Sequence, residues 1–132
     1  MTADAVVGEA TFGVDRSAAS RARSFLQVDL GCLGVAAEAI DTTVLLASEL
    51  ITNAVLHART DLVLRYVLHA YCVRIEVLDG NSILPTPIAA PLDATSGRGL
   101  ALVESLANNW GIERTPQGKT VWFELRLQPI AA

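Results

Sequence analysis

The segment Leu45–Ala58, LLASELITNAVLHA, constrains the fold of this chain more than any other stretch. Apolar residues occupy most positions around it, and a helix that is hydrophobic all round is usually buried. Into this apolar background the sequence sets Glu49, Asn53 and His57 at intervals of four residues. Each step of four turns only about 40° around a helix, so the three polar side chains form one narrow stripe.

A polar stripe on a buried helix needs partners. Moving an amide out of water without a hydrogen bond costs roughly 2–7 kcal/mol, and moving an ionised carboxylate costs more. The stripe is therefore expected to face a ligand or a cavity, or else to be hydrogen-bonded to neighbouring polar groups of the core. The residue pattern of the helix leaves both alternatives open.

Length and charge narrow the class of protein. At 132 residues, with 52% hydrophobic and 18% charged residues, the chain is expected to form a single globular domain over residues 1–132. A net charge of −4 argues against binding to nucleic acid or to anionic membranes, which requires a basic surface. No signal peptide and no membrane-spanning run is recognised, and Cys32 and Cys72 lack metal-type spacing, so we expect a cytoplasmic protein with free thiols.

The rest of the chain has an alternating pattern of elements. The predicted strands and helices are strand 9–14, helix 16–30 with Asp15 as its cap, helix 36–58, strands 62–69 and 72–78, a helix of about twelve residues after Gly97, and strands 110–114 and 119–127. This order predicts an α+β fold, a two-layer α/β sandwich with helices on one face of a mixed, mostly antiparallel sheet. The proline-containing segment 80–97 has little periodicity and is expected to be a functional loop or lid.

Two further features are chemically unusual. Asp79 continues the spacing of Val73, Ile75 and Val77, so its carboxylate is expected on the covered face of the sheet, where it needs a hydrogen-bond donor. Gly97-Arg98-Gly99 opens the third helix. Glycines allow a ligand to approach the backbone closely, and the N–H groups at a helix start attract phosphate.

In this order the motifs resemble those of the GHKL (Bergerat-fold) ATPases, specifically the small anti-sigma-factor serine kinases and their actinobacterial histidine-kinase-like relatives. ELITNAVLHA resembles the first motif of that family, VLDGNSILP the second, and GRGLALVESLANNWG with GKTVWFEL the last. The resemblance covers roughly residues 10–127, which is the expected ordered core. It implies a Bergerat ATP-binding fold in which residues 80–97 form the ATP lid.

The resemblance also implies roles for particular residues. Asn53 matches the asparagine whose oxygen ligates Mg²⁺ bound to the ATP phosphates, and Glu49 matches the catalytic glutamate that positions or deprotonates the attacking hydroxyl. Asp79 matches the aspartate that accepts a hydrogen bond from the adenine amino group, where a guanine carbonyl would face another acceptor.

The last motif supplies the remaining expected nucleotide contacts. Gly97, Arg98, Gly99 and Leu100 match the phosphate-cradling turn. The strand threonine near the adenine matches Thr120, although the alternation of the strand makes Lys119 the competing candidate. The second motif departs from the family pattern, because Asn81 and Ile83 stand where many members have glycine.

Two functions follow from the resemblance. The first is a Mg·ATP-dependent protein serine/threonine kinase that phosphorylates an anti-anti-sigma (STAS-type) partner and regulates transcription. The alternative is a nucleotide-binding module, or one that has lost its nucleotide, that sequesters a sigma factor or another regulator without turnover. Homodimerisation is also implied, and the apolar strand 9–14 is compatible with it. The remaining hypothesis is that the polar stripe belongs to a hydrogen-bond network of the core and binds no ligand.

Overall fold

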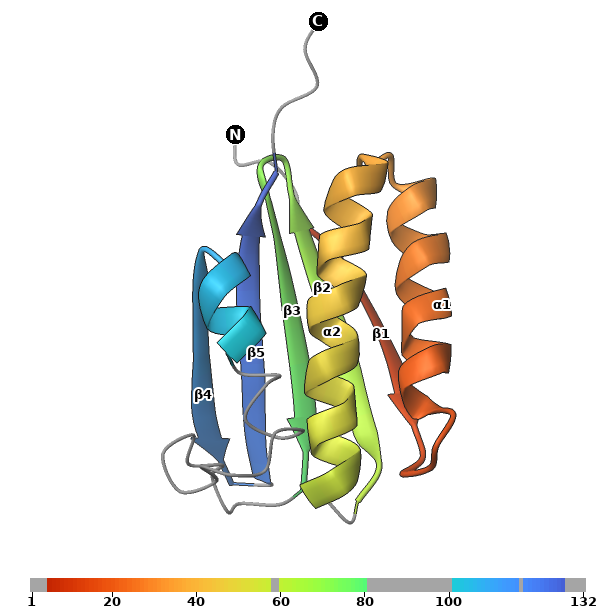
Figure 1. The fold of residues 1–132 in the computed structure, drawn as a ribbon, viewed down its shortest axis with the longest axis vertical. Coiled ribbons are helices and arrows are strands. Elements are labelled where there is room, and N and C mark those ends of the chain that lie inside the picture. Colours follow the sequence, from red (N-terminus) through yellow and green to blue (C-terminus); the bar gives the residue numbers. More distant parts are fainter. Residues whose placement is uncertain (1–4, 58–59, 81–100, 117, 128–132) are drawn as a thin grey trace, which may run out of the picture.

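The computed structural model describes residues 5–57, 60–80, 101–116 and 118–127. The elements follow the predicted order (Figure 1). The helices are α1, Ala18–Cys32, and α2, Ala37–His57, and residues 101–106 are also helical. The strands are β1, Val6–Phe12; β2, Leu62–His69; β3, Cys72–Asp79; β4, Asn109–Thr115; and β5, Gly118–Arg126.

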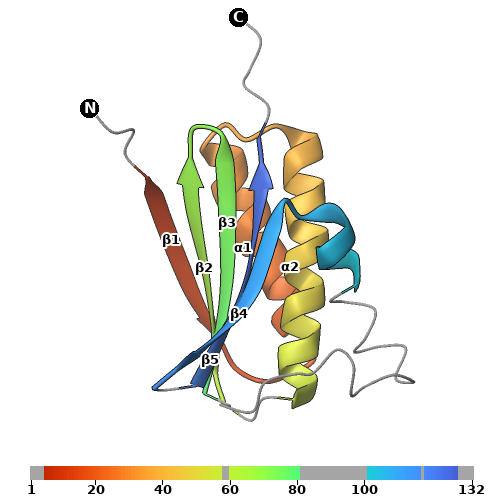
Figure 2. The ribbon, with the colours of Figure 1, turned by 90° about the vertical axis from the view of Figure 1, so that its left-hand side faces the viewer.

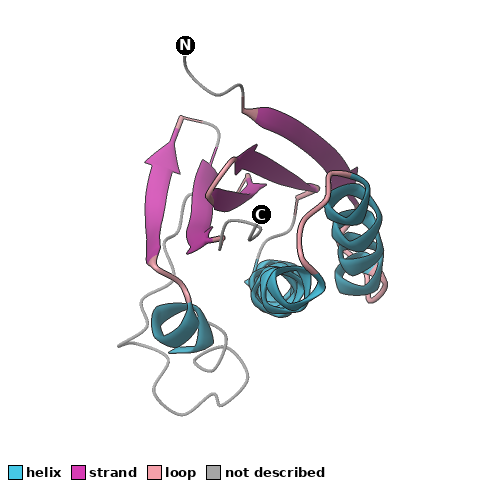
Figure 3. Ribbon diagram, turned by 90° about the horizontal axis from the view of Figure 1, so that it is seen from above, coloured by secondary structure: helices cyan, strands magenta, loops and turns pink. Residues whose placement is uncertain are grey.

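The strands form one five-stranded sheet in the order β1-β2-β3-β5-β4. Its neighbouring strands are antiparallel in every pair, so among the described strands the sheet is antiparallel rather than mixed. The helices lie together on one face of the sheet (Figures 2 and 3). The predicted α+β two-layer sandwich is therefore confirmed, and β1 is an edge strand.

The hydrophobic core lies between the sheet and the helices. Along β3, Val73, Ile75 and Val77 are buried, and the fully buried Phe123 of β5 lies opposite Ile75. The intervening residues of β3 carry charge, and Arg74 forms ion pairs with Glu76 and Glu124. The alternation predicted for β3 is thus confirmed. In β5 it holds from Val121 to Arg126, whereas Gly118, Lys119 and Thr120 are all buried.

The beginning of α1 differs from the prediction. Asp15 does not start the helix; its Oδ1 accepts hydrogen bonds from the Ser17 hydroxyl at 2.6 Å and the Ser17 N–H at 2.8 Å, and α1 begins at Ala18. These two hydrogen bonds lower the pKa of the Asp15 carboxyl. Similarly, β1 runs over Val6–Phe12 rather than 9–14, because its bounds are set by pairing with β2 rather than by its own composition.

Helix α2 is less buried than its sequence suggests. Leu46 and Ile51 are completely buried, but Leu45 is 43% and Leu56 is 53% exposed. The expectation of burial all round was therefore wrong, since in a two-layer fold one side of each helix remains on the surface. Residues Ala37–Leu56 are long and apolar enough to cross a membrane by length and composition, with a mean hydropathy of 1.4. Their packing against α1 and β3 is that of a core helix.

A buried tyrosine connects the helical layer to β2. Tyr66 is 4% exposed, and its hydroxyl donates a hydrogen bond of 2.7 Å to Asp29 Oδ2 of α1. Gly8 lies against the Tyr66 ring, where a Cβ would overlap the ring atoms. Burial, together with the hydrogen bond to Asp29 and the charge of that carboxylate, raises the pKa of Tyr66 to about 12.

Replacing Tyr66 by Phe is expected to lower the free energy of unfolding by about 1–3 kcal/mol at pH 8, because Asp29 loses its donor. Since the folded-state pKa is raised from 10.0 to about 12, the contribution of the hydroxyl is present below pH 10 and is lost as the pH rises towards 12. Urea unfolding should therefore show a smaller difference in the free energy of unfolding between wild type and variant at pH 11 than at pH 8. The exposed Tyr71 provides the control Tyr71→Phe, and an equal difference at both pH values would contradict the assignment.

Candidate functional site

The polar residues singled out in the sequence come from elements that meet at one end of the molecule. In Figure 1 the C-terminal end of α2, the C-terminal end of β3 and the beginning of β5 lie at the same lower end. Helix α2 packs against β3, and Asp79, the last residue of β3, is buried with the parity of Val77. The carboxylate of Asp79 therefore lies on the helix-covered face, as the alternation predicts.

The polar stripe of α2 contains one side-chain oxygen, on Asn53, that no described residue satisfies. Its Oδ1 is buried and has no hydrogen-bond partner among the residues that the structure describes. Glu49, one turn earlier, is half-buried, and no hydrogen bond or ion pair joins it to another residue of the described ranges. An unsatisfied buried polar atom costs about 1–3 kcal/mol, so a bound ligand, ion or water is expected to satisfy it.

Asp79 has a protein partner that the sequence only hinted at. Lys119 Nζ lies 3.1 Å from Asp79 Oδ2 and 3.3 Å from Oδ1, and the two residues are directly paired across β3 and β5. The side chains are 5% and 1% exposed, respectively. Lys119 is the only lysine of the chain. A buried carboxylate is thus matched by a buried ammonium at the position where the resemblance implies recognition of a nucleobase.

The same register places Thr120 and Asp79 on opposite faces of the sheet. Thr120 pairs with Leu78, whereas Asp79 pairs with Lys119. Because successive side chains of a strand point to opposite faces, Thr120 lies on the face away from Asp79. The residue of β5 that faces Asp79 is Lys119, the competing candidate from the sequence pattern.

Two glycines make close backbone contacts at this end of the sheet. Gly118 has φ +154°, and a Cβ there would collide with the Asp79 carbonyl oxygen. The N–H of Gly80 donates a hydrogen bond of 2.8 Å to Thr60 Oγ1, in the connection that follows α2. The sequence did not predict these contacts because they join segments far apart in the chain.

Several predicted site residues lie outside the described residues. These are Gly97, Arg98, Gly99 and Leu100 of the expected phosphate turn, with Asn81 and Ile83 of the second motif. Residues 81–97 of the expected lid are also among them, and the side chain of His57 is not described.

The donor set of the described residues fits one kind of metal site. Among these residues no three His, Cys, Asp or Glu side chains gather to form a metal cage. The unpartnered Asn53 Oδ1 is instead a single neutral oxygen. Mg²⁺ accepts hard oxygen ligands, keeps several waters and is commonly held by one or two protein oxygens plus substrate phosphates. Asn53 therefore fits a magnesium ion that arrives with a polyphosphate.

Comparison with known proteins decides the family. The profile of the histidine kinase-like ATPase domain matches residues 13–125. This chain belongs to the histidine kinase-like ATPase family. The match spans α1, α2 and the strands from β2 to β5, so it includes Glu49, Asn53, Asp79 and Lys119.

A solved structure supports the same fold for this ATPase domain. The RsbU and RsbW domains of Rv1364c from Mycobacterium tuberculosis are similar to it, with a TM-score of 0.72 and 24% sequence identity. The similarity covers 94% of this chain and 33% of the other, so the ATPase domain spans about a third of the length of that structure. The comparison with curated proteins gave no match.

Proposed function

We propose that this ATPase-family chain binds Mg·ATP and acts as an anti-sigma-factor-type protein serine/threonine kinase. The observation that carries the proposal is the buried, unpartnered Oδ1 of Asn53, one helical turn from the half-buried carboxylate of Glu49. A structural network would have satisfied that oxygen within the protein. An oxygen left unsatisfied in a member of this family is well explained as a ligand for the metal of a bound nucleotide.

The proposed division of labour follows the chemistry of each residue. Asn53 Oδ1 would hold Mg²⁺, which when bound neutralises charge on the phosphates. Glu49 would orient the serine or threonine hydroxyl of the protein substrate and accept its proton. The hydroxyl oxygen then bonds to the γ-phosphorus while the bond from phosphorus to the bridging oxygen of ADP breaks. Asp79 would accept a hydrogen bond from the base, and residues 97–100 would contact the phosphates.

The partner is proposed to be a STAS-type anti-anti-sigma protein, with a sigma factor as the second partner. The resemblance of the motifs and the similarity to a structure that contains an RsbW domain support this choice. A cytoplasmic homodimer that regulates transcription belongs to the same proposal. The test is to incubate the chain with ATP labelled at the γ-phosphate and a STAS-type protein from the same organism. Labelling of the STAS protein that requires Mg²⁺ is expected; nucleotide binding without any transfer would refute the kinase.

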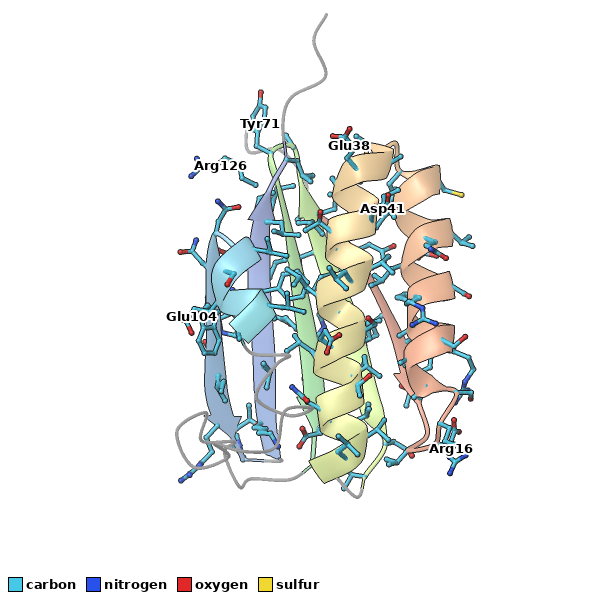
Figure 4. The ribbon with its side chains drawn as sticks, in the orientation of Figure 1. Arg16, Glu38, Asp41, Tyr71, Glu104 and Arg126 are labelled. Atoms are coloured by element: carbon cyan, nitrogen blue, oxygen red, sulfur yellow. The ribbon has the colours of Figure 1, made fainter. Side chains whose placement is uncertain are left out.

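Replacing Asn53 by Ala is expected to weaken Mg·ATP binding roughly 10- to 150-fold, the usual worth of a contact to a charged group. The same change removes an unsatisfied buried oxygen, so the thermal midpoint of the free protein should stay the same or rise. Calorimetric titration measures the affinity for Mg·ATP, and thermal unfolding measures the midpoint. The matched control is Glu38→Ala, an exposed position at the other end of the same helix (Figure 4). Lost stability with unchanged affinity would assign Asn53 to the core.

A second function is favoured by one observation. The ion pair of Asp79 with Lys119 engages the carboxylate expected to recognise the base, which would weaken nucleotide recognition. A regulator that sequesters a sigma factor without turnover needs no efficient catalysis. Binding of a sigma factor that is insensitive to Mg·ATP, with no transfer to any STAS protein, is the result expected of that alternative.

A further inference from the structure

The base-recognition end of the proposed site contains both a hydrogen-bond acceptor and a donor. Asp79 supplies the carboxylate, and Lys119 Nζ lies 3.1 and 3.3 Å from its two oxygens. Both side chains are buried on the face of the sheet that α2 covers. The following inference rests on the proposed function, because it concerns which base the nucleotide carries.

A carboxylate alone and a carboxylate beside an ammonium select different purines. Adenine presents an N6 amino donor next to the N1 acceptor, so a lone carboxylate accepts from N6 and repels a carbonyl at the same position. Hypoxanthine and guanine present the reverse, an O6 acceptor next to an N1–H donor. A neighbouring ammonium can donate to adenine N1 or to O6, while the carboxylate accepts from N6–H or N1–H.

We propose that Lys119 is a specificity-determining residue that lets this site accept 6-oxo purine nucleoside triphosphates as well as ATP. The pair of Asp79 and Lys119 can match either base edge. With adenine, Asp79 accepts from N6–H and Lys119 donates to N1; with a 6-oxo purine, Asp79 accepts from N1–H and Lys119 donates to O6. Without Lys119, the carbonyl of a 6-oxo purine would face the buried Asp79 carboxylate and would lose the ammonium as its donor. Burial makes that mismatch costly, by a factor of roughly 5–150 in affinity.

The test compares Mg·ATP with Mg·ITP, because the two nucleotides differ only at position 6 and in the proton on N1. Calorimetric titration of the wild-type protein should give dissociation constants within about fivefold of each other, the lower bound of a buried mismatch. A preference for ATP of more than about fivefold would overturn the inference while leaving ATP binding, and with it the proposed function, intact. If neither nucleotide binds, the proposed function fails and this inference with it.

A variant and a spectroscopic signal isolate Lys119 itself. Lys119→Met removes the donor at similar length, and it should prefer ATP over ITP by roughly 5- to 150-fold. Because Lys119 is the only lysine, protein labelled with isotopic lysine gives one side-chain signal in NMR spectra. That signal is expected to shift on addition of either nucleotide to the wild type. A shift with ATP but none with bound ITP would also overturn the inference, whether or not the variant folds.

Discussion

Glu49→Gln is expected to slow phosphate transfer to the partner by a factor of about 10²–10⁴, the usual contribution of a positioned general base. The amide keeps the size of the side chain but cannot accept the proton of the attacking hydroxyl. Glu49 is half-buried and forms no hydrogen bond or ion pair with another described residue, so the variant should fold normally. Its affinity for Mg·ATP should stay within a few-fold of wild type, because the proposed metal ligand Asn53 is unchanged. Single-turnover transfer and calorimetric titration measure the two quantities separately.

The chain offers a matched control for this change on the same helix. Glu38 is exposed in the first turn of α2, and Figure 4 shows it at the opposite end of the molecule from the end of β3. Glu38→Gln makes the same charge change and should leave transfer unaffected. If Glu49→Gln transferred phosphate at the wild-type rate, catalysis by Glu49 would be excluded, and Asn53 alone would remain as evidence for nucleotide binding.

The sequence predicted those parts of the site that depend on local periodicity. The four-residue spacing of Glu49 and Asn53 placed them on one stripe of α2, and the two-residue alternation placed Asp79 on the covered face of β3. The fold class followed from the order of the elements in the same way. These patterns are read within one helix or one strand, so no knowledge of distant contacts is needed.

The parts that were missed depend on pairing between distant segments. The partner of Asp79 is decided by the register of β3 with β5, which a one-residue slip would change from Lys119 to its neighbour Thr120. The insertion of β5 between β3 and β4 likewise appears in no local pattern. Burial all round α2 was predicted wrongly because composition does not say how many layers cover a helix, and Leu45 and Leu56 remain exposed.

The pairing of Asp79 with Lys119 leads to the largest expected effect on stability. Removing one partner of a buried ion pair takes away the charge that balances the other, so Lys119→Met should lower the free energy of unfolding by about 3–5 kcal/mol. The double variant Asp79→Asn with Lys119→Met contains neither charge and should recover most of that loss. Urea unfolding of the two single variants and the double variant gives the coupling energy directly.

An exposed ion pair of the same length separates burial from charge in this experiment. Arg21 Nη2 and Asp15 Oδ2 are 3.0 Å apart, close to the 3.1 Å of the buried pair, but their side chains are 48% and 54% exposed. Arg21→Met should therefore cost no more than about 1 kcal/mol. Equal losses for Arg21→Met and Lys119→Met would mean that water reaches Asp79 freely. In that case a 6-oxo purine would meet a solvated carboxylate rather than a buried one, and Lys119 would have little influence on the choice of base.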